Sequence, residues 1–406
     1  MLFKKPHRVA WLGLFVLTVL ALFCPPGKVF AHEISGFIAG EARLFPNEAL
    51  FPGQSDQSAS FALQPEYYHE FESGSSFTFV PFLRVDSGDQ ERTHFDIREL
   101  TYLWLQEDYE LRVGVRKVFW GTTEILHLVD IINQNDQVEN IDTEDKLGQP
   151  MVNVSFFRDW GSIDIFMMPF FRERTFQGVG GRLRGAIPID EDRVQYESSA
   201  EEWNSDWAMR YSHTFGDLDI GLSQFVGTNR EPTFLNGTDS SGNAIIIPRY
   251  DQIKQTSVDA SYVVGEWLWK LESLYRTGQG NDDYFAWTGG FEYTFTGILD
   301  SAMDFGVVGE WMFDTREERA TTAFENDIAT GLRLAVNDAA STVALLGWVQ
   351  DLDTSARFLF LEASRRFGDN WLLTAELRAF INQPMEDLLF GLRDDEIMQI
   401  ELAYYF

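Results

Sequence analysis

After residue 31 the chain repeats one pattern: segments of about ten residues alternate apolar with polar side chains, and turn-forming residues separate the segments. No apolar stretch in this region is long enough to cross a membrane as a helix. Because successive side chains of a strand point to opposite faces, each segment would have one apolar and one polar face. The pattern predicts an all-β fold, a transmembrane antiparallel β-barrel.

The alternation predicts eighteen strands, and sixteen is the alternative because the first strand and the one at 253–263 show the pattern only weakly. We expect strands at 33–43, 59–70, 76–86, 93–105, 109–118, 149–157, 162–172, 204–214, 217–227, 253–263, 266–277, 284–295, 301–313, 323–336, 341–351, 355–367, 371–382 and 395–406.

The lengths of the connections support an even number of strands. Connections after even-numbered strands are short, as in Phe215-Gly216 and Val264-Gly265. Those after odd-numbered strands are mostly longer, the third to fifth being the longest, and Leu352-Asp353-Thr354 is a short exception. Outer-membrane barrels have short periplasmic turns and long external loops. We therefore expect both ends of the barrel chain on the periplasmic side.

The end of the chain shows the alternation most clearly. Leu402, Tyr404 and Phe406 alternate with Ala403 and Tyr405. A terminal aromatic residue after alternating apolar positions resembles the signal by which outer-membrane barrels are recognised for assembly. The resemblance assigns that signal to Leu402, Tyr404 and Phe406 and implies the barrel-assembly machinery as a partner.

The first 31 residues resemble a secretory signal peptide. Lys4, Lys5 and Arg8 precede an uncharged apolar run, 10–23, and Ala31 ends a cleavage site before His32. The run is too short for a membrane anchor. A lipoprotein is disfavoured because Phe23 precedes Cys24, where a lipid-attachment site needs a small residue. We predict a signal peptide at 1–31 and a barrel domain at 32–406.

Composition excludes several classes of protein. The net charge is −31, and removing residues 1–31, with four basic and no acidic residues, would leave −35. So acidic a chain is a poor ligand for nucleic acid. With 35 Phe, 12 Trp and 13 Tyr it does not have the composition of a disordered protein. Cys24 is the only cysteine, so the mature chain would form no disulfide.

Several tryptophans fall near predicted strand ends, where barrels carry aromatic girdles. Core packing would explain any one of them, whereas their joint placement favours a membrane interface. They are Trp104, Trp207, Trp267, Trp311 and Trp371.

Charged residues occupy the face opposite the apolar one, where they would line the interior. In Leu111–Arg116 the leucine and valines would face lipid, which turns Arg112 and Arg116 inward. A charged Arg or Lys on the lipid face would cost about 2–4 kcal/mol at the midplane. The other expected inward charges are Arg84, Arg98, Arg172, Arg210, Lys270, Arg276, Arg333 and Arg378, with Asp96, Asp164, Asp259, Glu272, Glu292, Asp304, Glu310, Glu376 and Glu401.

The third external connection, 119–148, is far longer than a hairpin needs. Its first part is apolar, from Phe119 to Ile132, and its second part is acidic. Because an apolar loop would expose hydrocarbon to water, we expect it to fold into the barrel and pack on the wall. Its acids could then face Arg84, Arg98, Arg112 and Arg116, and the opposed charges would create a transverse electric field in the pore. A solvated acidic loop is the alternative.

These expectations give a set of candidate pore-lining residues, although most such charges simply pair and solvate a barrel interior. The set is Arg84, Arg98, Arg112, Arg116, Asp130, Asp136, Glu139, Arg172, Arg210, Glu272, Glu310 and Arg333.

We expect neither a catalytic site nor a metal or other cofactor. The acidic run Asp136–Asp145 offers oxygen ligands but lacks the spacing and glycine of a calcium loop, so a solvated face is favoured. A phospholipase would need Ser and His near the outer leaflet, whereas Ser212-His213 falls near a predicted periplasmic end.

The stretch Leu111–Gly121, followed by Asp130 and Asn133, resembles a motif of uncharacterised porin-like outer-membrane families. The resemblance covers about 30 residues and implies an outer-membrane barrel and a channel. We expect passive diffusion of small polar solutes through a loop-narrowed pore, in contact with outer-membrane lipid and lipopolysaccharide. The oligomeric state, a homotrimer included, stays open.

A substrate-specific transporter or exporter is the alternative. An exporter of acidic polysaccharide would need a lumen dominated by Arg and Lys, and the expected inward acids argue against it. A channel for hydrophobic compounds would need an apolar track, for which the apolar residues of 228–252 leave room. A structural or adhesive barrel would conduct nothing.

Overall fold

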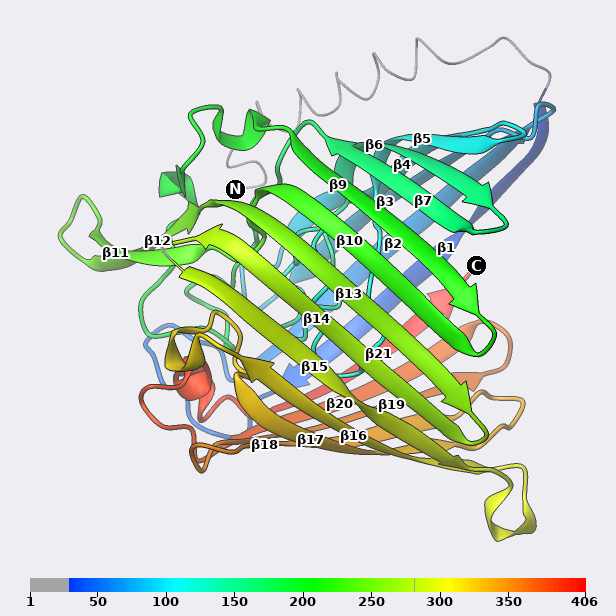
Figure 1. Ribbon diagram of the computed structural model, residues 1–406. Coiled ribbons are helices and arrows are strands. Elements are labelled where there is room, and N and C mark those ends of the chain that lie inside the picture. The colour runs from blue at the N-terminus through cyan, green and yellow to red at the C-terminus, as the bar shows by residue number, and fades with distance from the viewer. Residues whose placement is uncertain (1–28, 281) are drawn as a thin grey trace.

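The computed structural model describes residues 29–280 and 282–406 (Figure 1). The predicted signal peptide, 1–31, lies outside the described residues except for its last three positions, which begin the first strand. In the part of the chain that the structure describes, none of the helices has the length and apolarity needed to cross a membrane.

Eighteen strands form one antiparallel sheet that closes on itself, because β1 pairs with both β2 and β21. The fold class and the strand number expected from the alternation are therefore confirmed, and the two weakly patterned strands are present as β1 and β13. The barrel strands are β1 Val29–Leu44, β2 Gln57–Phe71, β3 Ser76–Asp86, β4 His94–Leu105, β5 Tyr109–Arg116, β6 Gln149–Arg158, β7 Gly161–Met168, β9 Asp206–Phe215, β10 Leu218–Thr228, β13 Gln252–Val264, β14 Trp267–Gln279, β15 Asp282–Phe295, β16 Asp304–Asp314, β17 Asn326–Ala335, β18 Val343–Asp351, β19 Arg357–Phe367, β20 Trp371–Ile381 and β21 Ile397–Tyr405.

The two faces of the barrel wall differ as the alternation requires. On β14, Trp269, Leu271 and Tyr275 are exposed, whereas Glu272 and Arg276 on the other face are buried. Such strands expose apolar side chains on the outside of the barrel and turn polar ones inward. The five tryptophans expected at the girdles are all exposed: Trp104, Trp207, Trp267, Trp311 and Trp371.

Short and long connections lie at opposite ends of the barrel (Figure 1). The long end carries the three longest connections, 117–148, 169–205 and 229–251. The start of β1 and the end of β21 both lie at the short-turn end, where the Phe406 backbone N–H donates to the Gly36 carbonyl at 3.0 Å and the Gly36 N–H donates back at 3.1 Å.

The strand β7 is shorter than the alternation of apolar and polar residues predicts. The alternation predicts a strand at 162–172, but β7 ends at Met168. Pro169 follows, and proline has no N–H to continue the ladder. Arg172 therefore lies in the connection after β7 rather than on the wall.

A second, three-stranded sheet stands at the long-connection end and was not expected from the sequence. The hairpin of β11 Thr233–Thr238 and β12 Ala244–Tyr250 projects from the barrel (Figure 1), and β8 Gln195–Tyr196 pairs with β12. Short 3-10 helices complete the connections: η1 Glu191–Arg193, η2 Glu201–Trp203, η3 Ile298–Asp300, η4 Glu317–Arg319 and η5 Leu388–Leu392.

Candidate functional site

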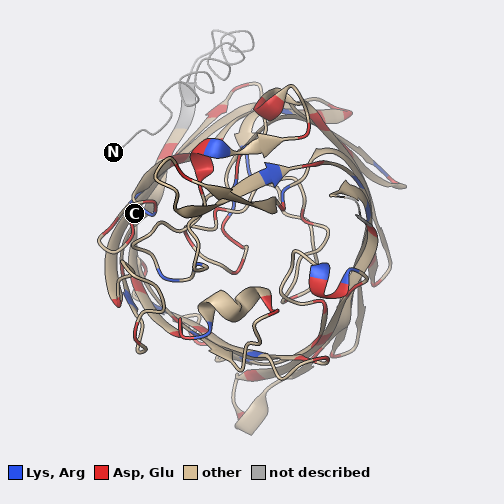
Figure 2. Cartoon of the chain, turned by 90° about the vertical axis from the view of Figure 1, so that its left-hand side faces the viewer, with Lys and Arg blue, Asp and Glu red and all other residues tan. Residues whose placement is uncertain are grey.

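Chain segments from the long connections lie within the ring of strands when the barrel is viewed from that end (Figure 2). The most extensive contacts are made by the connection between β5 and β6. Its apolar residues Trp120, Val129 and Ile132 form one buried cluster with wall residues of β6, β7, β9, β10 and β13, among them Phe166 and Phe225. Burial of this apolar surface attaches the first half of the connection to the wall.

Glu272 of β14 fixes the same part of the connection through its backbone. Its fully buried carboxylate accepts hydrogen bonds from the N–H groups of Thr122, Thr123 and Val129 at 2.6, 3.0 and 3.1 Å. The Thr123 hydroxyl donates to it at 2.7 Å. A buried carboxylate that accepts several hydrogen bonds tolerates its desolvation, so Glu272 acts as an anchor for the segment 122–129.

Glu124 extends these contacts to β16 and β17. Its backbone N–H donates to Glu310 of β16 at 2.7 Å, and its carboxylate lies 2.7 Å from Arg333 of β17 and 3.4 Å from Lys270 of β14. Burial raises the pKa of Glu124, but Arg333 and Lys270 outweigh it and hold that pKa below its usual value. In the ring of 18 strands β17 lies opposite β5, from which this connection starts.

The acidic second half of the connection meets arginines on the side of β1–β4. The Glu139 carboxylate lies 2.8 Å from Nε of Arg84, and Asp136 lies 2.6 Å from Nη1 of Arg98. Arg43 of β1 donates to the Glu139 carbonyl at 2.7 Å. Burial opposes ionisation of Asp136, but Arg98 and its other partners keep the pKa of this carboxyl below its usual range.

Other predicted site residues have partners within the wall or within the connection itself. The geometry does not pair Arg112 and Arg116 with the loop acids as expected: Arg112 pairs with Glu110 at 2.5 Å, and Arg116 donates to Asn153 at 2.6 Å. Their partners lie on β5 itself and on the adjacent β6, whereas Asp136 and Glu139 contact arginines of β4 and β3.

Three further candidates are also paired. Asp130 pairs with Lys146 of the same connection at 2.9 Å. Arg172, although beyond its predicted strand, lies 2.7 Å from Asp96 of β4. Arg210 forms a bidentate ion pair with Asp259, with N–O distances of 2.6 and 2.7 Å.

Several buried arginines in the connections were missed in the sequence analysis, and two of them link one connection to another. Arg230 lies 2.6 Å from Asp206 and donates to the Ile132 carbonyl, which ties the connection after β10 to that after β5. Arg182 lies 2.6 Å from Asp395, and both side chains are completely buried. Neither arginine stands in an alternating segment, so the pattern gave no signal for them.

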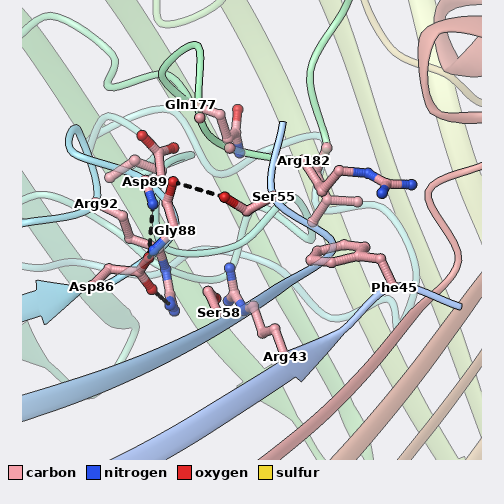
Figure 3. Close-up of a pocket in the computed structure, with 14 residues that line it drawn as sticks. Arg43, Phe45, Ser55, Ser58, Asp86, Gly88, Asp89, Arg92, Gln177 and Arg182 are labelled. Atoms are coloured by element: carbon pink, nitrogen blue, oxygen red, sulfur yellow. Dashed lines mark hydrogen bonds and ion pairs between the residues drawn. The ribbon is translucent and has the colours of Figure 1, made fainter. Parts of the chain in front are cut away.

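A small cavity lies beside these ion pairs, and Arg43, Arg92, Arg182, Asp86 and Asp89 are among the residues that line it (Figure 3). Its volume is about 30 Å³, which is room for about two water molecules. Arg92 lies 2.7 Å from Glu41 and 2.9 Å from Asp86, so the cavity wall is already charge-paired.

Comparisons with known proteins bear on the fold. No family model matches the chain, and no curated protein matches it in sequence. OpdQ of Pseudomonas aeruginosa is similar in structure, with a TM-score of 0.53 and 11% identity over 93% of this chain and 99% of that one.

A triple mutant of the Rh. blastica porin gives a TM-score of 0.45 at 11% identity, over 93% of this chain and all of that one. At such identities only the fold is shared. The strand order, the closure and this likeness agree: the protein has a porin-like fold, a closed antiparallel β-barrel of 18 strands.

Proposed function

We propose that the protein is an outer-membrane channel for passive diffusion of small polar solutes and that residues 119–148 form the narrow part of its pore. The observation that carries the proposal is the reach of this connection. Its segment 122–130 contacts β14, β16 and β17, and its segment 136–142 contacts β1, β3, β4 and β20.

The charges of the interior favour polar solutes of either sign over a polymer of one sign. Basic and acidic side chains pair in the interior, both within the wall, as in Arg210–Asp259, and between the wall and the connection 117–148, as in Arg333–Glu124. Paired charges leave local fields that orient a polar solute without a large net potential. An exporter of acidic polysaccharide would need an excess of positive charge, and these acids argue against it.

The alternative of a channel for hydrophobic compounds finds less support. Of the apolar residues of 228–252, Ile245 and Ile247 are buried in the second sheet, whereas Phe234 is exposed, with its ring 5.8 Å from that of Phe176. The two buried isoleucines stabilise the hairpin and are not available to line a path.

The exposed apolar outer face supports placement in a membrane, and a membrane with an assembly system for barrels is the bacterial outer membrane. In that membrane the protein would contact lipid and lipopolysaccharide. The barrel-assembly machinery would recognise it through Leu402, Tyr404 and Phe406. A homotrimer is one assembly open to such a barrel. The charge pairs on the inner face serve passage rather than catalysis.

A shortened connection tests the channel. The Asp136 N–H donates to the Asp145 carbonyl at 2.8 Å, so residues 137–144 can be replaced by a two-glycine turn without moving the ends. In planar bilayers the shortened variant should conduct more than the wild type, because the narrow part has lost wall material. The matched control removes eight residues, 237–244, from the projecting hairpin of β11 and β12 and should conduct as the wild type does.

Equal conductance of all three proteins would place residues 119–148 outside the conducting path. No conductance from any folded variant, with folding checked by heat-modifiable gel migration, would reject the channel itself and favour a structural barrel.

A further inference from the structure

Three ligand atoms converge where β4 meets the connection between β5 and β6. They are Nε2 of His94, Oδ2 of Asp136 and Oε1 of Glu139, and all three lie within 4.8 Å of one another. Asp136 and Glu139 are buried, with 0% and 4% of their surfaces exposed. Among the described residues, Nε2 of His94 and Oε1 of Glu139 are buried and have no hydrogen-bond partner, whereas Oδ2 of Asp136 lies 2.6 Å from Nη1 of Arg98.

The chain builds this cluster from two local features. His94 begins β4 on the face that also carries Asp96 and Arg98, so it points to the interior. Asp136 and Glu139 flank a tight turn in which the Glu139 N–H donates to the Asp136 carbonyl at 3.0 Å, and the turn brings both carboxylates to His94.

The orientation of the imidazole leaves Nε2 free to bind. Nδ1 of His94 lies 3.2 Å from the carbonyl of Arg92, to which it donates in the neutral ring. A metal ion binds the neutral ring, in which Nε2 carries a lone pair toward the two carboxylate oxygens. A carbonyl that accepts from the remote ring nitrogen is the usual support of a metal-binding histidine.

The distances suit an ion better than a proton. Nε2 lies 3.6 Å from Oδ2 of Asp136 and 3.5 Å from Oε1 of Glu139. Hydrogen bonds from an imidazolium would need about 2.7–3.2 Å. Ligands at about 2.0–2.2 Å from a tetrahedral zinc ion stand about 3.4 Å apart, close to the two separations seen.

We propose that His94, Asp136 and Glu139 bind a divalent transition-metal ion of the zinc type, with water as a further ligand. One imidazole and two carboxylates suit Zn²⁺ better than Ca²⁺, which takes oxygen ligands only. The ion would link His94 of β4 to Asp136 and Glu139 of the connection 119–148. Its coordination bonds would add to the ion pairs that already hold this connection.

The neighbouring arginines Arg84 and Arg98 lower the affinity of the two carboxylates for a metal ion, but they leave ligand positions open. Arg84 occupies the other oxygen of Glu139. Arg98 lies 2.6 Å from Oδ2 of Asp136, and that oxygen keeps a second lone pair for the ion. The Thr175 hydroxyl donates to the remaining oxygen of Asp136 at 2.6 Å, so the carboxylate is held in place from behind.

The test measures zinc binding by the purified full chain after removal of metal with a chelator. Isothermal titration should give one Zn²⁺ per wild-type chain, and Zn²⁺ should raise its melting temperature because it binds the folded state. His94→Gln removes the one ligand that forms no ion pair with arginine, so the loop contacts of Asp136 and Glu139 remain. This variant should bind at least about tenfold more weakly.

His127→Gln is the matched control, because His127 lies in the same connection beside Glu272, 3.9 Å away, and outside the cluster. It should bind zinc as the wild type does. If the wild type takes up no zinc, or if His94→Gln binds it unchanged, these three residues do not form a zinc site and the proposal is wrong. The measurement needs no conductance, so its outcome is independent of the proposed channel.

Discussion

The carboxylate of Glu139 lies 2.8 Å from Nε of Arg84, although the two residues are 55 positions apart in the chain. Both are buried, and Nη1 of Arg84 also lies 3.3 Å from Glu41 of β1. The pair therefore joins the connection between β5 and β6 to a network that already links β1 and β3. Its loss should release the connection without opening the wall.

Replacing Glu139 tests this link. Glu139→Gln should lower the free energy of unfolding by about 1.5–3 kcal/mol, the usual contribution of a hydrogen bond to a charged group, because Arg84 keeps Glu41 as a partner. Urea unfolding of the detergent-solubilised barrel gives the value. Glu107→Gln, at an exposed turn between β4 and β5, is the control and should change nothing. Equal stability of both variants would mean that the pair contributes nothing to holding the connection.

The completely buried pair Arg182–Asp395 ties the connection after β7 to the one before β21. Arg182→Met leaves Asp395 as a buried carboxylate with fewer partners, and loss of one member of such a pair costs about 3–5 kcal/mol. The double variant Arg182→Met/Asp395→Leu removes both charges and should lose less than the sum of the two single variants. Thermal unfolding of the four proteins measures the coupling, and additive losses would show that the two charges act independently.

Glu325, in the connection between β16 and β17, gives a pH dependence. Burial, followed by the carboxylates of Asp351, Asp387 and Asp353, raises the pKa of Glu325 to about 7. The folded state thus keeps a proton that the unfolded chain releases near pH 4.5, so this group makes stability fall as pH rises from about 4.5 to 7.

Melting temperatures at pH 5 and pH 8 check this prediction. Glu325→Gln cannot ionise, so its melting temperature should fall less than that of the wild type over the same range. Glu317→Gln, in the same connection, should behave as the wild type does. An identical fall in wild type and Glu325→Gln would show that this carboxyl titrates normally.

Phe406 links the end of the chain to its start. Its backbone exchanges two hydrogen bonds with Gly36, and its side chain is exposed on the outside of the barrel. Deleting Phe406 should reduce the heat-modifiable, membrane-inserted form, because the last two hydrogen bonds between the chain ends and the terminal aromatic side chain are both lost. Phe406→Tyr should assemble normally. Assembly of the truncated chain at the wild-type level would contradict the assigned assembly signal.

The sequence alone determined the strands. Alternation with a period of two residues is a local property, so each segment shows by itself which residues face outward, and all eighteen strands were located, even the weak β13. The lengths of the connections also showed which strand ends lie at the short-turn end of the barrel and which lie at the long-connection end. Pro169, which ends β7 early, was overlooked, and the small sheet of β8, β11 and β12 was not expected.

Only the tertiary structure decided which charges meet. The sequence placed arginines and acids on one face, but it could not say that Glu139 pairs with Arg84 or that Asp136 pairs with Arg98. His94 carried no signal either, because its partners come from a turn more than one strand away. Such contacts depend on the register of non-adjacent strands and on how a long connection packs in the interior, and neither has a period that a sequence can display.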